Sequence, residues 1–288
     1  MRHLFTITLL LVFTSTLSPS IYAADTEICR FGVPPWQKGR SFKEERKKYL
    51  PLLNWMSKQT GCKFVPVGAN SYEDLINKIS EGIVQVTELG AIPYIEVKKK
   101  NPDVDILATA LVWNSAGDKL VDTYHSMIVA LKKNEAVNSL QDLKGQKFGF
   151  VNRESTSGFV YPSASMKKEA GIDYETFFSK YFFLSSHPNV TDAIVAGSIV
   201  AGATYGTNLD AAQKKHGDIF KVLWESKPIP NVLLASHPSL PDSIKEKLIE
   251  VLPQANIELF KDISLMKGFV IRPDSFYDEV RAVLEGSE

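Results

Sequence analysis

The stretch "KFGFVNRESTSGFVYP", residues 147–162, sets the fold class expected for this chain and points to a site within it. Its start, "KFGFV", is a short apolar run with two aromatic side chains, which is typical of a buried strand. The residues from about Ser157 onward predict a helix. Three consecutive hydroxyl side chains, those of Ser155, Thr156 and Ser157, stand at this strand-to-helix junction, directly before Gly158.

A catalytic role for these hydroxyls has little support in the sequence. The G-x-S-x-G turn of hydrolases does not fit, because Glu154 stands two residues before Thr156 and Ser155 stands two before Ser157. A lone pairing with His187 as general base is a weak signal without an orienting acid. The phosphate loop G-x-x-x-x-G-K-[ST] does not occur either. We therefore expect no enzyme.

Two other interpretations of the junction remain open. A helix N-cap needs only one Ser or Thr. An anion cradle uses all three hydroxyls, together with the free backbone N–H groups and the positive end of the helix dipole. In a cradle, Gly158 would let the backbone approach the ligand closely. The chemistry of these residues alone supports the cap and the cradle equally.

Polar side chains at other expected strand ends favour the cradle. Tyr94 follows a strand in "VTELGAIPYIEV", His187 follows one in "LSSHPNVTDAIVAG", and Tyr205 follows one in "AGATYGTN". Ligands of open α/β sheets bind at the carboxyl ends of the strands. The alternatives are a helix cap or loop position for His187 and burial in the core for the two tyrosines.

Short strand-like runs alternate with longer amphipathic ones on both sides of the junction. This βαβα rhythm predicts parallel sheets with helices on both faces. It occurs twice, which predicts two α/β units of four strands each. Extended segments near 123–127 and 229–232 are the expected crossings between the units, and the C-terminal helices are expected to return to the first unit. A single cleft then lies between the two sheets, and the units are hinged.

The first residues, "MRHLFTITLLLVFTSTLSPSIYAAD", are typical of a secretory signal peptide, with cleavage expected after Ala23. A membrane anchor is the alternative, but the apolar run is shorter than the ~20 residues that span a bilayer. We therefore expect an exported protein. Its 33 Lys and Arg balance its 33 Asp and Glu, which argues against general binding to nucleic acid. Its five His and two Cys show no metal-ligand spacing, so neither metal nor cofactor is expected.

The two cysteines, Cys29 and Cys62, are an even pair in a chain expected to reach an oxidising compartment. Cys29 lies in the first expected strand and Cys62 opens the second, and we expect these strands to be parallel neighbours. A disulfide between them is predicted, with two buried free thiols as the alternative.

The order of several segments resembles the periplasmic phosphonate- and phosphite-binding proteins of ABC transporters. These segments are "YEDLINKISEG", "LGAIPY", "YHSMIV", "SLQDLKGQKFGFVNRESTSGFVYP", "SHPNVTDAIVAG" and "IPNVLLA". The resemblance implies a type II periplasmic binding fold, with two α/β lobes joined by two crossing strands and the ligand cleft between them. The expected lobes are residues 24–124 plus 231–288 and residues 125–230, after the signal peptide of residues 1–23.

The resemblance also implies a function and partners. A small phosphorus oxyanion or phosphonate is expected to bind in the periplasm, and an ABC permease in the inner membrane is expected to receive it from a monomer. The alternative is a sensory protein of the same fold that signals to a receptor or histidine kinase. The ligand-binding residues that the resemblance implies are Ser155, Thr156, Ser157, Tyr94 and His187. Tyr205 lies in a loop that the family also uses, and we add its side chain and Gly158 of the cradle to the expected site.

The sequence departs from the family pattern at Val200, where relatives often carry an acidic residue. We place Val200 at a strand end facing the ligand. An apolar side chain there predicts a small oxyanion or alkylphosphonate rather than an aminoalkylphosphonate, whose buried ammonium group needs a carboxylate.

Overall fold

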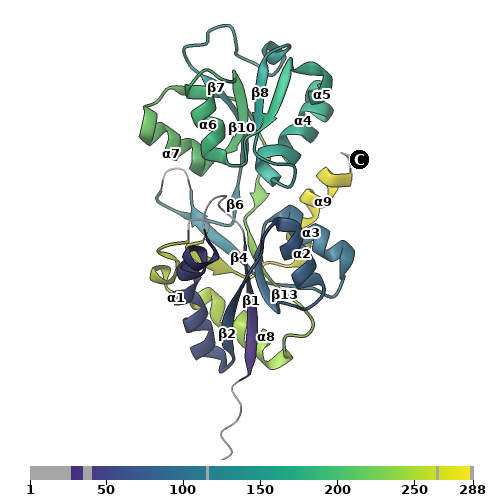
Figure 1. Ribbon diagram of the computed structural model, residues 1–288, viewed down its shortest axis with the longest axis vertical. Helices are drawn as coiled ribbons and strands as arrows, with labels where there is room; N and C mark the ends of the chain where they lie inside the picture. Colours follow the sequence, from purple (N-terminus) through teal and green to yellow (C-terminus); the bar gives the residue numbers. More distant parts are fainter. Residues whose placement is uncertain (1–26, 35–40, 115–116, 264–265, 286–288) are drawn as a thin grey trace, which may run out of the picture.

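The computed structural model describes residues 27–34, 41–114, 117–263 and 266–285, so the predicted signal peptide lies outside the described residues. Figure 1 shows two α/β lobes stacked along the long axis of the molecule. Lobe I is built on the sheet that contains β1, and lobe II is built on the sheet that contains β7. Within the described residues, no helix combines the length and the apolar character needed to cross a membrane.

Each lobe has its own sheet. The sheet of lobe I has the order β14-β4-β13-β3-β1-β2, with β5 paired to β4. Its strands are β1 (Ile28–Val33), β2 (Lys63–Gly68), β3 (Val86–Leu89), β4 (Asp105–Trp113), β5 (Leu120–Val121), β13 (Leu233–Ser236) and β14 (Gly268–Val270). The sheet of lobe II has the order β11-β7-β10-β8-β9. Its strands are β7 (Ser126–Leu131), β8 (Lys147–Phe150), β9 (Lys180–Phe183), β10 (Ala201–Tyr205) and β11 (Phe220–Glu225).

The lobes are connected by a two-stranded antiparallel ribbon. Its strands are β6 (Thr123–Tyr124) and β12 (Ile229–Pro230), which lie in the two segments predicted as crossings. The sheets are mixed rather than parallel throughout, contrary to prediction. Strand β7 is antiparallel to β10 and β11, and β13 is antiparallel to β3 and β4. Both strands directly follow a crossing, so each enters its sheet from the opposite lobe and runs against its neighbours.

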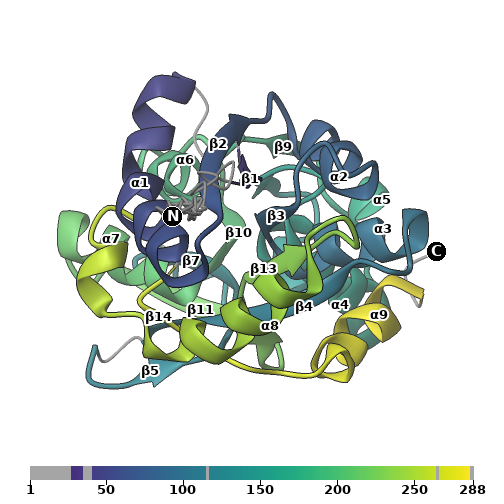
Figure 2. The same cartoon turned by 90° about the horizontal axis from the view of Figure 1, so that it is seen from below.

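Helices cover both faces of each sheet (Figures 1 and 2). They are α1 (Phe42–Thr60), α2 (Tyr72–Ser80), α3 (Ala91–Lys100), α4 (Tyr161–Ala170), α5 (Tyr174–Phe177), α6 (His187–Val195), α7 (Gly206–His216), α8 (Asp242–Val251) and α9 (Asp278–Glu285). In lobe I, α1 and α8 pack in one apolar core, while α2, α3 and α9 pack in another. Helix α1 begins at a capping box formed by Ser41 and Glu44, and it ends at Gly61 in a left-handed conformation.

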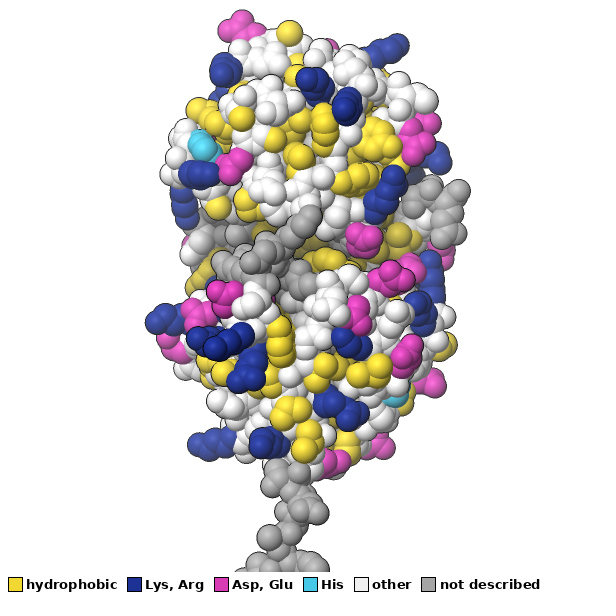
Figure 3. All heavy atoms as spheres, viewed as in Figure 1, with side chains coloured by type: hydrophobic (Ala, Val, Ile, Leu, Met, Phe, Trp, Pro, Cys, Tyr) yellow, Lys and Arg dark blue, Asp and Glu magenta, His cyan; other side chains and the backbone are white. Residues whose placement is uncertain are grey.

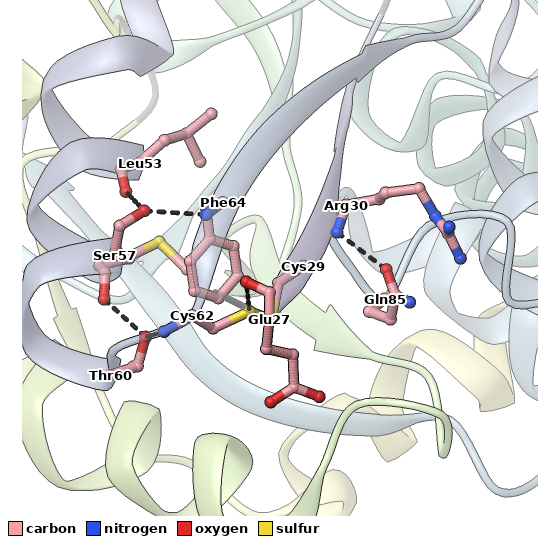
Figure 4. Close-up of a disulfide and its surroundings, with 10 residues drawn as sticks. Glu27, Cys29, Arg30, Leu53, Ser57, Thr60, Cys62, Phe64 and Gln85 are labelled. Atoms are coloured by element: carbon pink, nitrogen blue, oxygen red, sulfur yellow. Dashed lines mark hydrogen bonds between the residues drawn. A yellow bond between two sulfur atoms is a disulfide. The ribbon is translucent and has the colours of Figure 1, made fainter. Parts of the chain in front are cut away.

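The predicted disulfide between Cys29 and Cys62 is confirmed (Figure 4). Cys29 lies in β1, and Cys62 directly precedes the parallel neighbour β2. Their Cα atoms are 6.0 Å apart, and both side chains are buried in the core beneath α1. The bond therefore closes the loop that carries α1.

Removing the disulfide with the double substitution Cys29→Ala and Cys62→Ala should lower the free energy of unfolding by about 3–4 kcal/mol. The reason is that the bond closes a loop with a sequence separation of 33 and so restricts the unfolded chain. Urea unfolding of both proteins measures the difference. Thiol titration of unfolded, unreduced wild type is the control and should find no free thiol, whereas two free thiols would contradict the pairing.

Candidate functional site

The strand-to-helix junction of lobe II begins with a cap. Strand β8 leads into a single π-helical turn, η2 (Thr156–Val160), before α4 starts. Ser155 is the N-cap of this turn, and its Oγ accepts the backbone N–H of Gly158 at 3.0 Å. The backbone carbonyl of Ser155 accepts the N–H groups of Phe159 and Val160. One of the three hydroxyls therefore serves as the cap.

The next two residues keep their donors available. Among the described residues, the backbone N–H groups of Thr156 and Ser157 have no hydrogen-bond partner. Both residues are buried, with 7% and 4% of their surface exposed. The carbonyl of Ser157 is held by the hydroxyl of Ser126, at 2.8 Å. N–H groups at a helix start are suited to bind anions, so the junction contains a cap and, beside it, the donors that an anion cradle would use.

Gly158 is required for a different reason from the one expected. A Cβ atom at this position would lie 2.4 Å from Cγ2 of Val151 and 2.7 Å from Oγ of Ser155. The glycine thus allows η2 to fold tightly against the end of β8. Close approach of a ligand to its backbone is not needed to explain it.

Tyr124, in crossing strand β6, lies against the cradle and was missed by the sequence analysis. Burial raises the pKa of Tyr124 to about 12, while hydrogen bonding to Ser157 and Thr156 lowers it in part. The ring of Tyr205 meets it edge-on at 6.0 Å, and the ring of His187 meets Tyr205 at 4.6 Å. These contacts bring Tyr205 and His187 together with the cradle, as predicted from their positions at strand ends.

His187 begins α6, directly after the capping residue Ser186. Burial lowers the pKa of His187 to about 3, so its imidazole is uncharged at neutral pH. Its Nδ1 atom is buried, with no hydrogen-bond partner among the described residues. Burial is likewise the cause that raises the pKa of Tyr205. The cluster is therefore built from neutral hydrogen-bonding groups.

Lobe I contributes two further groups that the sequence analysis did not identify. Tyr72 is the first residue of α2, and burial raises its pKa, helped by the negative charges of Glu88 and Glu154. Glu88 lies in β3 with 1% of its surface exposed, and its carboxylate accepts the hydroxyl of Tyr49 at 2.8 Å. Burial raises the pKa of Glu88 to about 8. On the face in Figure 3, the surface is indented between the lobes.

Tyr94 does not join this cluster. It is fully buried in the core of lobe I, edge-on to Tyr277 at 5.6 Å, and its hydroxyl donates to Asp274. Arg281 also binds Asp274, at 2.7 Å. Tyr94 therefore ties α3 to the C-terminal segment, and we remove it from the candidate site.

Val200 is also not where it was expected. It directly precedes β10, whereas the cleft lies at the other end of this strand, where Tyr205 stands. Val200 packs instead against the core of lobe II. The argument from Val200 for a small oxyanion or alkylphosphonate over an aminoalkylphosphonate is therefore withdrawn. Within the described residues, no three side chains are grouped in a way that could hold a metal ion.

Two α/β lobes, two crossing strands and a neutral polar cluster where they meet define a two-lobe periplasmic binding protein. The family model described as "ABC transporter, phosphonate, periplasmic substrate-binding protein" matches residues 31–277. The chain belongs to this family.

Individual relatives agree with this assignment. Phosphate-import protein PhnD of Mycolicibacterium smegmatis is 27% identical over 268 residues, covering 84% of this chain and 82% of that protein. A binding protein component of an ABC phosphonate transporter from Pseudomonas aeruginosa has a TM-score of 0.72 at 22% identity, covering 91% of this chain and 87% of that one. PhnD1 from Prochlorococcus marinus in complex with methylphosphonate has a TM-score of 0.73 at 17% identity, covering 91% and 98%.

Tyr124 lies beside the cradle and Tyr94 does not, so the effects of substituting them on ligand affinity can be compared directly. Tyr124→Phe should weaken ligand binding by about 5- to 10-fold, because a hydroxyl at the cradle is lost. Tyr94→Phe should leave the affinity within about 2-fold, because its hydroxyl binds Asp274 instead. Calorimetric titration with methylphosphonate measures both. The reverse order of effects would return Tyr94 to the site.

The buried Glu88 predicts a pH-dependent stability. The folded state keeps the proton up to about pH 8, whereas the unfolded chain releases it near pH 4.5. Folding is therefore progressively disfavoured as pH rises between these values, and the loss is complete above pH 8. The advantage in melting temperature of Glu88→Gln over wild type should grow across this window in ligand-free protein. The exposed Glu154→Gln is the control, and a difference that does not vary with pH would contradict the assignment.

Proposed function

We propose that the protein captures a small phosphorus oxyanion or phosphonate at the start of η2 and delivers it to an ABC permease in the inner membrane. The observation that carries this proposal is the pair of backbone N–H groups of Thr156 and Ser157, which are buried and have no hydrogen-bond partner within the part of the chain that the structure describes. Tyr124 and His187 add neutral hydrogen-bonding groups around the same point.

The donors described here (backbone N–H groups and hydroxyls) would stabilise an oxyanion without help from a charge of their own. Backbone and hydroxyl donors in a buried site form charge-assisted hydrogen bonds, which are about twice as strong as bonds between neutral groups. The positive end of the helix dipole adds to them at the same place. Neutral donors also allow ready release when the cleft opens, because water can replace each of them.

The ligand class follows from the relatives. The Mycolicibacterium relative is named for phosphate import, and the Prochlorococcus structure contains methylphosphonate. We propose the same class for this chain, comprising phosphate, phosphite and alkylphosphonates. Aminoalkylphosphonates are also kept as candidate ligands, since the buried carboxyl of Glu88 lies near Tyr72.

Transport is favoured over sensing, because the family is a component of ABC transporters. We propose a monomer that acts in the periplasm and does not turn over its ligand. The moving units are taken as residues 24–124 plus 231–288 and residues 125–230, with the ribbon of β6 and β12 as the hinge. Such rigid lobes close by rotation about a few crossing residues.

Thr156→Ala should reduce affinity by about 1.5–3 kcal/mol, the range for hydrogen bonds to charged groups. It removes the hydroxyl but leaves the backbone donors in place. Calorimetric titrations of wild type and variant with phosphate, phosphite, methylphosphonate and aminoethylphosphonate measure the loss and identify the ligand.

Ser163→Ala is the matched control, because Ser163 lies in α4 and its hydroxyl donates to the backbone carbonyl of Phe159 in η2 at 2.7 Å. Its affinity should match that of wild type. A loss of stability in ligand-free Thr156→Ala, with affinity retained, would mean that the hydroxyl is only structural. Failure of wild type to bind any of the four compounds would refute the proposed ligand class.

A further inference from the structure

One apolar core is shared between the two lobes. Tyr161, the first residue of α4 in lobe II, has 3% of its surface exposed and belongs to an apolar core that also contains residues of α2, α3 and α9 of lobe I. Helix α4 contacts α9 directly, and α9 contributes Val280 to the same core. Both ribbon views place α9 beside the start of α4 (Figures 1 and 2).

Tyr161 is joined rigidly to the cradle. It follows η2 directly, and its backbone N–H bonds to the carbonyl of Thr156. Any movement of the Tyr161 ring relative to α9 therefore moves the turn that holds the proposed anion site. The side chain acts on the lobe interface, while the backbone four and five residues earlier carries the N–H groups proposed to bind the ligand.

The ring and the hydroxyl of Tyr161 have opposite effects on closure. The ring is buried in the arrangement in which α4 contacts α9 of lobe I, and burial of this apolar surface favours that contact. The hydroxyl is buried without a hydrogen-bond partner among the described residues. Burial raises its pKa, with further contributions from Tyr124 and Glu279. Opening the cleft would give this hydroxyl water, so its burial favours the open state.

We propose that Tyr161 is a positioning residue that sets the balance between closed and open cleft, and thereby the rate of ligand release, without touching the ligand. The effect on release rests on the proposed function, whereas the effect on lobe closure does not. The buried ring of Tyr161 holds the lobes in contact. The free-energy cost of burying its hydroxyl keeps this contact weak enough for the lobes to separate.

A second link between the lobes provides a control. Lys227 follows β11 of lobe II and pairs with Glu279 of α9 at 3.2 Å, with 79% and 52% of the two side chains exposed. Exposed ion pairs contribute little, since solvent screens them. Lys227→Met removes a connection between the lobes at the same helix without changing the buried contact.

The test compares Tyr161→Phe and Tyr161→Ala with wild type and Lys227→Met. Stopped-flow measurement gives the dissociation rate of methylphosphonate, and small-angle scattering gives the radius of gyration of ligand-free protein. Tyr161→Phe should release ligand about 3- to 10-fold more slowly, because the closed state no longer buries an unpaired hydroxyl. Tyr161→Ala should release it at least about 10-fold faster and have a larger radius of gyration. Lys227→Met should stay within about 2-fold of wild type.

Opposite effects of Phe and Ala cannot arise from a general loss of stability, which would act in one direction. If Tyr161→Ala does not fold, Tyr161→Leu replaces it with the same expected direction. Equal release rates and radii across wild type, Phe and Ala would overturn the proposal, and so would faster release from Tyr161→Phe. If wild type binds no methylphosphonate, the proposed ligand is wrong, and the scattering series alone then decides the role of Tyr161.

Discussion

Two backbone N–H groups that bond to none of the described residues, those of Thr156 and Ser157, are the constraint on which the rest of the structure depends. Buried N–H groups must bond to water or to a ligand. The turn that exposes them requires Gly158, because any larger residue would collide with Val151. In the proposed function these donors exchange water for a ligand, and two lobes that can separate would allow this exchange.

The groups around the donors come from different parts of the chain. Ser126 and His187 belong to lobe II, Tyr124 to the ribbon between the lobes, and Tyr72 to lobe I. The hydroxyl of Ser126, a few residues beyond the ribbon, bonds to the carbonyl of Ser157. The turn that carries these donors is thus attached to the start of β7, next to the ribbon that connects the lobes.

The sequence predicted the features that depend on residues close to one another along the chain. The cluster ending at Gly158 and the histidine that begins α6 carry their own cap and turn signals, so both were found. Tyr124 was missed because a tyrosine in a two-residue strand has no local signature, and only the pairing with β12 places it beside the cradle. Tyr94 was wrongly included in the candidate site, because it lies on the face of α3 that packs into the core of lobe I. The antiparallel strand β13 could not be foreseen, since its direction depends on the crossing before it.

The order of strands in lobe I has a consequence for how the chain folds. Strand β13 lies between β3 and β4, although all of lobe II separates it from them in the sequence. During synthesis, β3 and β4 are made before β13. The edges with which β13 pairs therefore stay unpaired until lobe II has been synthesised, and unpaired strand edges favour aggregation. The Cys29–Cys62 bond joins β1 and β2, which both precede the gap. The disulfide can fix the pairing of β1 and β2 early, and so provide an ordered part of the sheet before β13 inserts.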